Sequence, residues 1–390
     1  MYAAPSGRCN GVLPNDHPSG QLAFDGGGWN GGAMRTYTFS GTPRAIGRAF
    51  GESCRSEIHT LYGLRIDNAI AQALKYGGQI VDEARVLDVA RRSLAITRDY
   101  DARGMDELEG IAEGADLPIE RVLALNGLTD FRDVLSWPAA PEAPIDEGGC
   151  TALVAAPDRS ATGEVLCGQT WDLATDNLPH TIAVHRRPDD APETWCLTTD
   201  GCLSLIGLNE AGLAIGTTNI RTTDARPGVN YLSIIHQALA RRDFEAAVAD
   251  IVHAPRAGAH FYYVAAADGR AALIECSARA AYRQDLTSGV GVHTNHCLLP
   301  ETRAIEGNRP ATSTLARQAR MSALSDRADL TLEDLEAFFA DTSNGADAIC
   351  RDDIDGLNTN GAVVMSPHSG RIFACHGVPS RGRWLDLRSP

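Results

Sequence analysis

Apolar residues recur at two different spacings along this chain, and the change falls before its middle. Over residues 58–127 the spacing is helical, as in the stretch from Leu87 to Ile96. Residues three and four apart lie on one face of a helix, so this part is predicted to be mostly helical. Ahead of it, Tyr37–Phe39 predicts a short strand, and Gly41-Thr42-Pro43 predicts the start of a further helix.

Beyond residue 150, short apolar runs bounded by turn residues predict strands. They cover residues 151–156, 165–170, 181–185, 195–198, 203–208, 213–217, 261–265, 272–275, 290–295, 362–365 and 372–374. Helical spacing returns at about 231–241, 243–253, 312–325 and 331–340. The turns Asn209–Gly212 and Asp268-Gly269 predict hairpins. Hairpins alternating with paired helices predict an α+β fold in which helices cover antiparallel sheets.

Two stretches are expected to lack regular structure. Residues 1–34 end in a glycine-rich run, which resists helix and strand alike. Trp137–Pro144 is rich in proline and alanine and is expected to be extended. This second stretch leads directly into Gly148-Gly149-Cys150, so the joint between the helical and strand-rich parts carries the first candidate for chemistry.

Charge and composition narrow the class of protein. The net charge of −15 argues against nucleic acid or an anionic membrane as the main partner, because both select basic surfaces. No apolar run approaches the ~20 residues that cross a bilayer. Residues 1–20 are polar and lack the pattern of a signal peptide, so a cytoplasmic protein is expected. No phosphate-binding or dinucleotide loop occurs, and no cofactor is expected.

The ten cysteines are scattered without a Cys-x-x-Cys pair, and a chain of 390 residues does not need disulfides to fold. We expect one reactive thiol among them, Cys150. If the bond before Cys150 were cut, its α-amine would lie beside its own thiol and could take the thiol proton. Gly148 and Gly149 suit such a cut, because glycine permits a strained backbone and unhindered attack. A buried strand cysteine after a glycine loop is the plainer alternative.

Four polar residues could support that thiol. Asp172 ends a strand that can lie beside the one starting after Cys150, where a carboxylate would orient the α-amine. Asn219 and Asn295 are at strand ends, where an amide can stabilise an oxyanion. Arg351 could hold Asp172 or a substrate carboxylate. Each also has a structural interpretation as a turn or surface residue.

His293 and His296 have the spacing of a metal pair. On a strand, however, this spacing places the two rings on opposite faces. We therefore expect structural histidines and no metal.

Several separated segments, in order, resemble the acyl-coenzyme A:6-aminopenicillanic acid acyltransferase family, also called isopenicillin N acyltransferases. These are N-terminal nucleophile (Ntn) hydrolases, similar to the peptidase C45 group. The segments are Gly41–Gly51, Glu109–Ala115, Val122–Asn126, Gly149–Thr151, Gly168–Asp172, Gly207–Leu213, Val292–Leu299 and Ile349–Arg351. Thr170 stands where the family has asparagine. Gly207–Leu213 matches a hairpin shared with bile-salt and penicillin V hydrolases.

The resemblance implies a four-layer αββα sandwich of antiparallel sheets with a helical N-terminal segment. It implies that self-cleavage at Gly149 and Cys150 yields an α part, 1–149, and a catalytic β part, 150–390, which stay together as a heterodimer that could assemble further. It makes Cys150 the nucleophile, Asp172 its polar partner, Asn295 an oxyanion donor and Arg351 a charge-stabilising residue. Asn219 matches the oxyanion asparagine of the bile-salt hydrolases.

One position departs from those hydrolases. They have an arginine three residues before the aspartate, where this chain has Gln169. A cationic neighbour for Cys150 is therefore in question, and a bile-salt type of substrate is disfavoured.

Three functions remain open at this point. The leading hypothesis is an autoproteolytic amide hydrolase or acyltransferase that forms a Cys150 thioester with an N-acylated amine or amino-acid-like small molecule. The second is a homologue that keeps the fold and only binds a small molecule. The third is a Cys–His thiol hydrolase without self-cleavage, with His293 or His296 as base.

Overall fold

The computed structural model describes residues 34–136, 149–307, 312–354 and 356–389, apart from the side chain of Leu128. The stretches expected to be irregular, 1–34 and 137–144, lie outside this part except for Met34, and so does Gly148. No helix in the described ranges is both long and apolar enough to cross a membrane.

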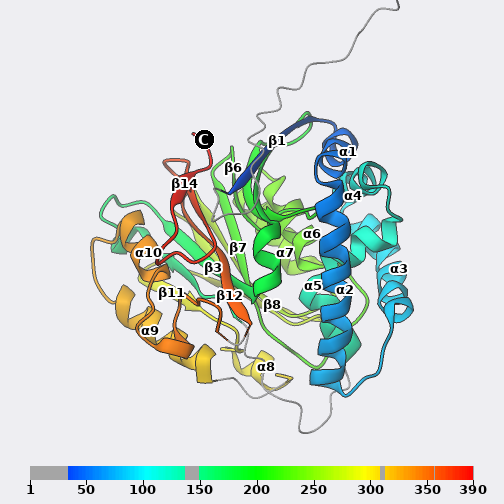
Figure 1. Ribbon diagram of the computed structural model, residues 1–390. Helices are drawn as coiled ribbons and strands as arrows, with labels where there is room; N and C mark the ends of the chain where they lie inside the picture. Colours follow the sequence, from blue (N-terminus) through cyan, green and yellow to red (C-terminus); the bar gives the residue numbers. More distant parts are fainter. Residues whose placement is uncertain (1–33, 137–148, 308–311, 355, 390) are drawn as a thin grey trace, which may run out of the picture. The chain divides into compact units, whose positions relative to one another are not determined.

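Two β-sheets face each other at the centre of the fold (Figure 1). Sheet A has the strand order β1-β4-β5-β6-β7-β8-β9-β10, and sheet B has the order β11-β2-β3-β12-β13-β14. The strands of sheet A are β1 (Arg35–Gly41), β4 (Thr181–Pro188), β5 (Thr194–Thr199), β6 (Ile206–Asn209), β7 (Leu213–Asn219), β8 (His260–Ala266), β9 (Ala271–Cys276) and β10 (Ala281–Asp285). Those of sheet B are β2 (Ala152–Ala155), β3 (Leu166–Ala174), β11 (Val290–His293), β12 (Leu357–Ser366), β13 (Arg371–His376) and β14 (Trp384–Asp386).

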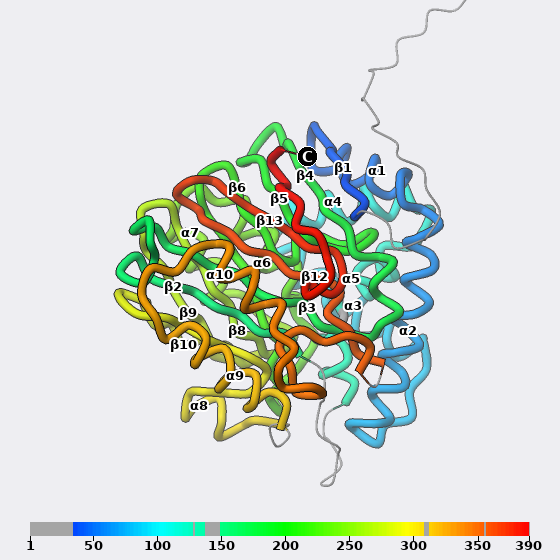
Figure 2. Tube along the Cα trace, turned by 60° about the vertical axis from the view of Figure 1, so that its left-hand side comes forward, coloured from blue at the N-terminus to red at the C-terminus, as the bar shows by residue number. Residues whose placement is uncertain are grey.

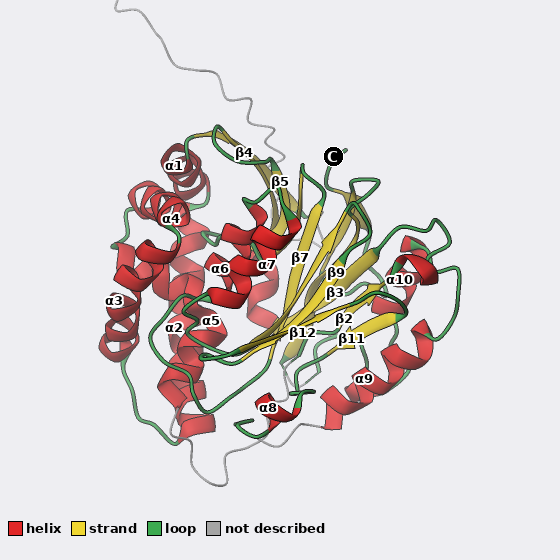
Figure 3. Ribbon diagram, turned by 180° about the vertical axis from the view of Figure 1, so that it is seen from behind, coloured by secondary structure: helices red, strands yellow, loops and turns green. Residues whose placement is uncertain are grey.

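Helices cover both outer faces of this pair of sheets (Figure 3). Helices α6 (Tyr231–Leu239) and α7 (Phe244–His253) pack on sheet A, and α9 (Thr312–Ser325) and α10 (Leu332–Phe339) pack on sheet B. The N-terminal helices are α1 (Pro43–Ser53), α2 (Arg55–Gly77), α3 (Glu83–Tyr100), α4 (Ala102–Ala115) and α5 (Ile119–Ser136). Helix α1 packs on β1 and β4 of sheet A, and α4 and α5 contact α6. The short α8 (Pro300–Arg303) completes the described helices. The expected four-layer αββα arrangement is confirmed.

One pair of strands departs from the antiparallel arrangement. Strand β1 runs parallel to β4, whereas all other neighbouring strands are antiparallel. The reason is that β1 comes from the N-terminal part of the chain and joins the edge of sheet A without a hairpin connection. Thr42 then caps α1, because its side chain accepts a hydrogen bond from the Ala45 amide.

Strand β2 illustrates why the sequences of the central strands are continuous apolar runs. All four of its residues are buried, Ala152 and Val154 in the main core and Leu153 and Ala155 in a second cluster under α9 and α10. A strand covered on both faces has no polar alternation. Figure 2 follows how strands distant in sequence meet here: β12, near the C-terminal end, pairs with β3.

Candidate active site

A cavity of about 250 Å³ is lined by residues of α2, α5, β3 and β7. Four side chains that the sequence singles out lie in its wall: Cys150, Asp172, Asn219 and Asn295. Gly149, the residue before the candidate cut, lines it as well. Arg351 does not line the cavity but is buried beside Asp172, with its Nε 4.0 Å from Asp172 Oδ2. Residues from four distant parts of the sequence thus converge.

The position of Cys150 follows from strand pairing. Cys150 lies two residues before the start of β2, which is antiparallel to β3, the strand that carries Asp172. The Thr151 amide donates to Thr170 Oγ1 at 3.0 Å, and the Thr170 amide donates to Thr151 O at 2.9 Å. Burial, followed by the nearby Asp172 carboxylate, raises the pKa of the Cys150 thiol to about 12. With its own nitrogen in a peptide bond, Cys150 is therefore protonated and weakly nucleophilic at neutral pH.

Asp172 is fully buried, and neither of its carboxylate oxygens accepts a hydrogen bond from a described residue. Thr170 and Thr359 are close enough to lower its pKa but lie outside hydrogen-bonding geometry. Burial raises the pKa of Asp172 to about 6, although Arg351 and Arg317 oppose the rise. A buried acceptor without a donor costs roughly 1–3 kcal/mol or more. A hydrogen-bond donor placed beside Cys150 would offset this cost.

The two asparagines meet at the same end of the cavity. Asn295 Nδ2 donates to the backbone carbonyl of Asn219 at 2.8 Å. Asn219 Oδ1 accepts from Arg132 Nη2 at 3.0 Å. A Cβ atom built on Gly149 would lie 2.0 Å from Asn295 Oδ1, so Gly149 packs against this amide as closely as a glycine can. The amide that could stabilise an oxyanion therefore borders the bond that would be cut.

Sequence reasoning missed Arg317, which is fully buried on α9. Its Nη1 donates to the Cys150 carbonyl oxygen at 2.5 Å, and its Nη2 donates to Asn295 Oδ1 at 3.0 Å. Burial, followed by the neighbouring Arg351, lowers the pKa of Arg317 to about 10, so its guanidinium remains charged at neutral pH. Helical spacing held the signal: Arg317 lies four residues before Met321, on the buried face of α9.

His260 is the histidine that lines the cavity, and it too was missed. Its Nε2 bonds Asp130 Oδ1 at 3.0 Å, and its Nδ1 lies 3.3 Å from Thr217 Oγ1. The imidazole also stacks on Tyr231, with ring centroids 4.4 Å apart. Both ring nitrogens are thus engaged by other side chains than Cys150.

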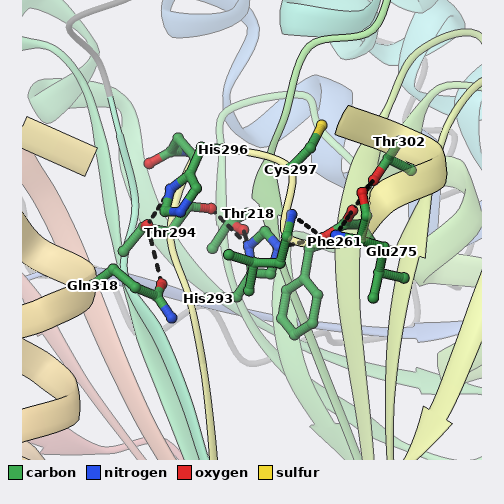
Figure 4. Close-up of polar contacts among 12 residues, drawn as sticks. Thr218, Phe261, Glu275, His293, Thr294, His296, Cys297, Thr302 and Gln318 are labelled. Carbon is green, nitrogen blue, oxygen red and sulfur yellow. Dashed lines mark hydrogen bonds and ion pairs between the residues drawn. The ribbon is translucent and has the colours of Figure 1, made fainter. Parts of the chain in front are cut away.

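His293 and His296 bond different side chains (Figure 4), and neither lines this cavity. His293 lies between Thr218 and Glu275, with Nδ1 2.9 Å from Thr218 Oγ1 and Nε2 3.0 Å from Glu275 Oε2. His296 faces Thr294, and burial lowers the pKa of its imidazole to about 4.

Glu275 ties this cluster to the loop that carries Asn295. It accepts hydrogen bonds from the amides of Leu298 and Leu299 and from the Thr302 hydroxyl. The two expected structural histidines therefore shape the loop around Asn295. Within the described ranges, no group of three or more histidine, cysteine or carboxylate side chains is arranged to hold a metal ion.

Comparison with known proteins gives three kinds of match. The sequence profile of the family described as acyl-coenzyme A:6-aminopenicillanic acid acyl-transferase matches residues 159–380. This range contains Asp172, Asn219, Asn295 and Arg351 and begins after Cys150. The chain is also 26% identical over 342 residues to the acyl-coenzyme A:6-aminopenicillanic-acid-acyltransferase 40 kDa form of Emericella nidulans, which covers 87% of this chain and 91% of that protein.

Two solved structures are similar at a lower level. Penicillin V acylase from Agrobacterium tumefaciens is 17% identical, with 62% of this chain and 87% of that chain covered and a TM-score of 0.41. A mutant conjugated bile acid hydrolase from Clostridium perfringens is 12% identical, with 62% and 93% covered and a TM-score of 0.39.

Proposed function

Because this chain belongs to the acyl-coenzyme A:6-aminopenicillanic acid acyl-transferase family, we propose that it is a self-cleaving amide hydrolase or acyltransferase with Cys150 as nucleophile. The observation that carries the proposal is the pair formed by Cys150 and Asp172. A buried carboxylate without a hydrogen-bond donor among the described residues lies beside the one cavity-lining cysteine. A free α-amine on Cys150 would supply both the base for the thiol and the donor for the carboxylate.

Self-cleavage divides the chain into 1–149 and 150–390. The Cys150 sulfur attacks the Gly149 carbonyl carbon and the peptide C–N bond breaks, so the nitrogen gains a proton and a thioester forms. Water then hydrolyses the thioester. The products are a carboxylate on Gly149 and a free amine and thiol on Cys150. Asn295 lies beside Gly149, with its amide oxygen nearest, so its amide nitrogen is the group that would donate to the developing oxyanion.

The same groups serve turnover once the amine is free. The α-amine takes the thiol proton, and the sulfur attacks the acyl carbonyl of an N-acylated amine or amino-acid-like substrate. The amine returns the proton to the leaving nitrogen, and a Cys150 thioester remains. Water or a second amine attacks the thioester and restores the thiol. Asp172 orients the ammonium, Arg351 balances the carboxylate, and Asn295, with Asn219 nearby, stabilises the oxyanion.

Intact-protein mass spectrometry under denaturing conditions tests the proposal directly. Wild type should give fragments of roughly 16 and 26 kDa, if the 41.5 kDa mass is divided in proportion to length, with Cys150 as a new N-terminus. Cys150→Ala should give one intact chain. A single 41.5 kDa species in folded wild type would overturn the proposed self-cleavage.

The position of His260 favours one competing hypothesis, a Cys–His thiol hydrolase without self-cleavage. It lines the same cavity as Cys150 and is hydrogen-bonded to a buried aspartate, Asp130. A His260→Gln variant separates the two mechanisms. The proposed function predicts that folded His260→Gln still cleaves before Cys150. A thiol hydrolase that uses His260 as base would be uncut already in the wild type, and its His260→Gln variant would lose turnover of N-acyl amides.

A further inference from the structure

Arg317 is buried without a carboxylate partner among the described residues. Its guanidinium donates to three neutral oxygens around the candidate cut, namely the Cys150 carbonyl, Thr151 Oγ1 at 3.1 Å and Asn295 Oδ1, and its Nε donates to Ser313 Oγ at 3.3 Å. Burying a cation without a counter-ion is costly, so such a residue marks a functional site more often than a structural one. A role for Arg317 should therefore require both the charge and the planar shape of its guanidinium.

The charge balance near the thiol is positive. Arg317 and Arg351 are both buried and share one neighbour, since each donates to the Ser313 hydroxyl. Asp172 is the carboxylate with the largest effect on the Cys150 thiol, and both arginines oppose it. Two buried cations and one buried anion leave a positive field, and in a low-dielectric interior such a field is weakly screened.

Gln169 cannot supply this charge. Its side chain is committed to strand β7, with Nε2 donating to Thr217 O at 2.7 Å and Oε1 accepting from the Thr217 amide at 2.6 Å. Strand β3 therefore provides no cation beside Cys150, and α9 provides one, Arg317.

Arg317 also decides which way the Asn295 amide faces. A guanidinium only donates hydrogen bonds, so an amide packed against it must present its oxygen. The Asn295 nitrogen then faces the opposite side, where it reaches the Asn219 carbonyl. Without Arg317 the amide oxygen would lose this donor, and the orientation of the amide beside Gly149 would no longer be fixed.

We propose that Arg317 is a positioning residue with two separable effects: its charge stabilises the Cys150 thiolate, and its planar fork fixes the orientation of the Asn295 amide beside the reacting bond. The second effect rests on the proposed function. The first does not, because it concerns the Cys150 thiol in the cut and in the uncut chain.

Two variants divide the effects. Arg317→Lys keeps the charge and loses the fork, whereas Arg317→Gln keeps a polar side chain and loses the charge. Arg320→Gln is the matched control, because Arg320 lies on the same helix and pairs at the surface with Asp341. Folding of each variant is compared by circular dichroism and urea unfolding.

The first readout is the pH dependence of alkylation of Cys150 by iodoacetamide, followed on tryptic peptides. The peptide that begins at Cys150 differs in mass from the peptide that contains it internally, so cut and uncut forms are measured separately. Arg317→Gln should alkylate about tenfold more slowly at a given pH, which corresponds to one unit in thiol pKa. Arg317→Lys and Arg320→Gln should stay within about twofold of wild type. A wild-type rate in folded Arg317→Gln would overturn the electrostatic role.

The second readout is the rate of self-cleavage. Both Arg317 variants should cut at least about tenfold more slowly than wild type, because both lose the fork that orients Asn295. Cleavage of Arg317→Lys at the wild-type rate would overturn the orienting role. If wild type itself stays uncut, the proposed function fails, while the alkylation profiles still decide whether Arg317 tunes the thiol. If both variants fail to fold, the electrostatic role is tested by adding guanidinium ion to Arg317→Gly. Restored alkylation of Cys150 supports that role, and a lack of restoration rejects it.

Discussion

At the scale of single residues, Asp172 carries the strongest pH dependence in the site. Its pKa in the folded, uncut chain is raised to about 6 from an ordinary value of 3.8, with burial as the main cause. The native state therefore binds this proton more tightly than the unfolded state does. The contribution to stability is full below pH 3.8 and is lost as the pH rises through about 6.

We expect this loss to be about 3 kcal/mol, since one pKa unit corresponds to about 1.4 kcal/mol. The measurement is urea unfolding at pH 4, 5, 6 and 7 of Cys150→Ala, which stays uncut, against Cys150→Ala/Asp172→Asn, which lacks the carboxyl group. The double variant should be the less pH-dependent of the two by this amount. Parallel pH profiles would show that the carboxyl is already paired in the uncut chain.

Gly149 gives a steric prediction. A methyl group in its place would lie 2.0 Å from Asn295 Oδ1 and 2.3 Å from Arg317 Nη2, so the scissile bond or the amide must shift. Displacements of about 1 Å can cost roughly 10²-fold in rate. Gly149→Ala should accumulate uncut chain, quantified by mass spectrometry over time. Gly63→Ala, at an exposed helical position without neighbours for a Cβ, should cut normally, and equal rates in both would refute the steric argument.

These residues differ in how far the sequence could reveal them. Asp172, Asn295 and Arg351 are in short motifs that a family resemblance brings together. Arg317 lies in the middle of a helix among other arginines, and its helical spacing to Met321 is the local signal that distinguishes it from the partly exposed Arg320, three residues later. Arginine is rarely fully buried, so propensity favours the surface for both. Only the packing of α9 on sheet B selects Arg317 for the interior.

At the scale of elements, apolar periodicity predicted buried strands better than exposed ones. The hairpin of β8 and β9 was expected because its apolar runs flank Asp268-Gly269. The adjacent β10, Ala281–Asp285, was missed because it is a largely exposed edge strand with polar residues at most positions. The apolar run of β3 ends at Thr170, but the strand includes Asp172, as expected, and continues to Ala174, because residues 171–174 pair with β12.

Gln169 on β3 makes one of the hydrogen-bonded contacts between the two sheets. The ladder between β6 and β7 ends at Ile215, and the Gln169 amide takes up the Thr217 N–H and C=O beyond it. Gln169→Leu would leave both buried backbone groups without partners. We expect a loss of about 2–4 kcal/mol in the free energy of unfolding, measured with urea. Gln284→Leu, at an exposed position on β10, should change it by less than about 0.5 kcal/mol. A similar small change in both variants would contradict this role.

At the scale of the whole molecule, the proposed cut divides a single core. Strand β1 pairs with β4 across the junction, and three buried side chains of the N-terminal part bond the rest of the chain. Arg65 Nη2 donates to Thr199 Oγ1 at 2.8 Å, Glu107 pairs with Arg186 at 2.7 Å, and Asp130 bonds His260. Burial alone would raise the pKa of Glu107, but Arg186 and His236 hold it well below its ordinary value. The carboxylate is therefore charged at all physiological pH values, and its pairing persists after the cut.

We accordingly expect the two fragments to remain bound to each other. Size-exclusion chromatography of cut protein should give one peak at or above the 41.5 kDa of the whole chain, and only denaturant should separate the two fragments.

Glu107→Gln leaves Arg186 buried without its counter-ion, which costs about 3–5 kcal/mol, so the fragments should dissociate at lower urea concentration. Glu109→Gln is the control, since Glu109 lies on the same helix and pairs only with Arg44 and Arg98, on its own side of the cut. Because those pairs are partly exposed, it should cost less than about 1 kcal/mol. Spontaneous separation of the wild-type fragments in buffer would mean that the shared core is not sufficient to hold them together once the peptide bond between them is cut.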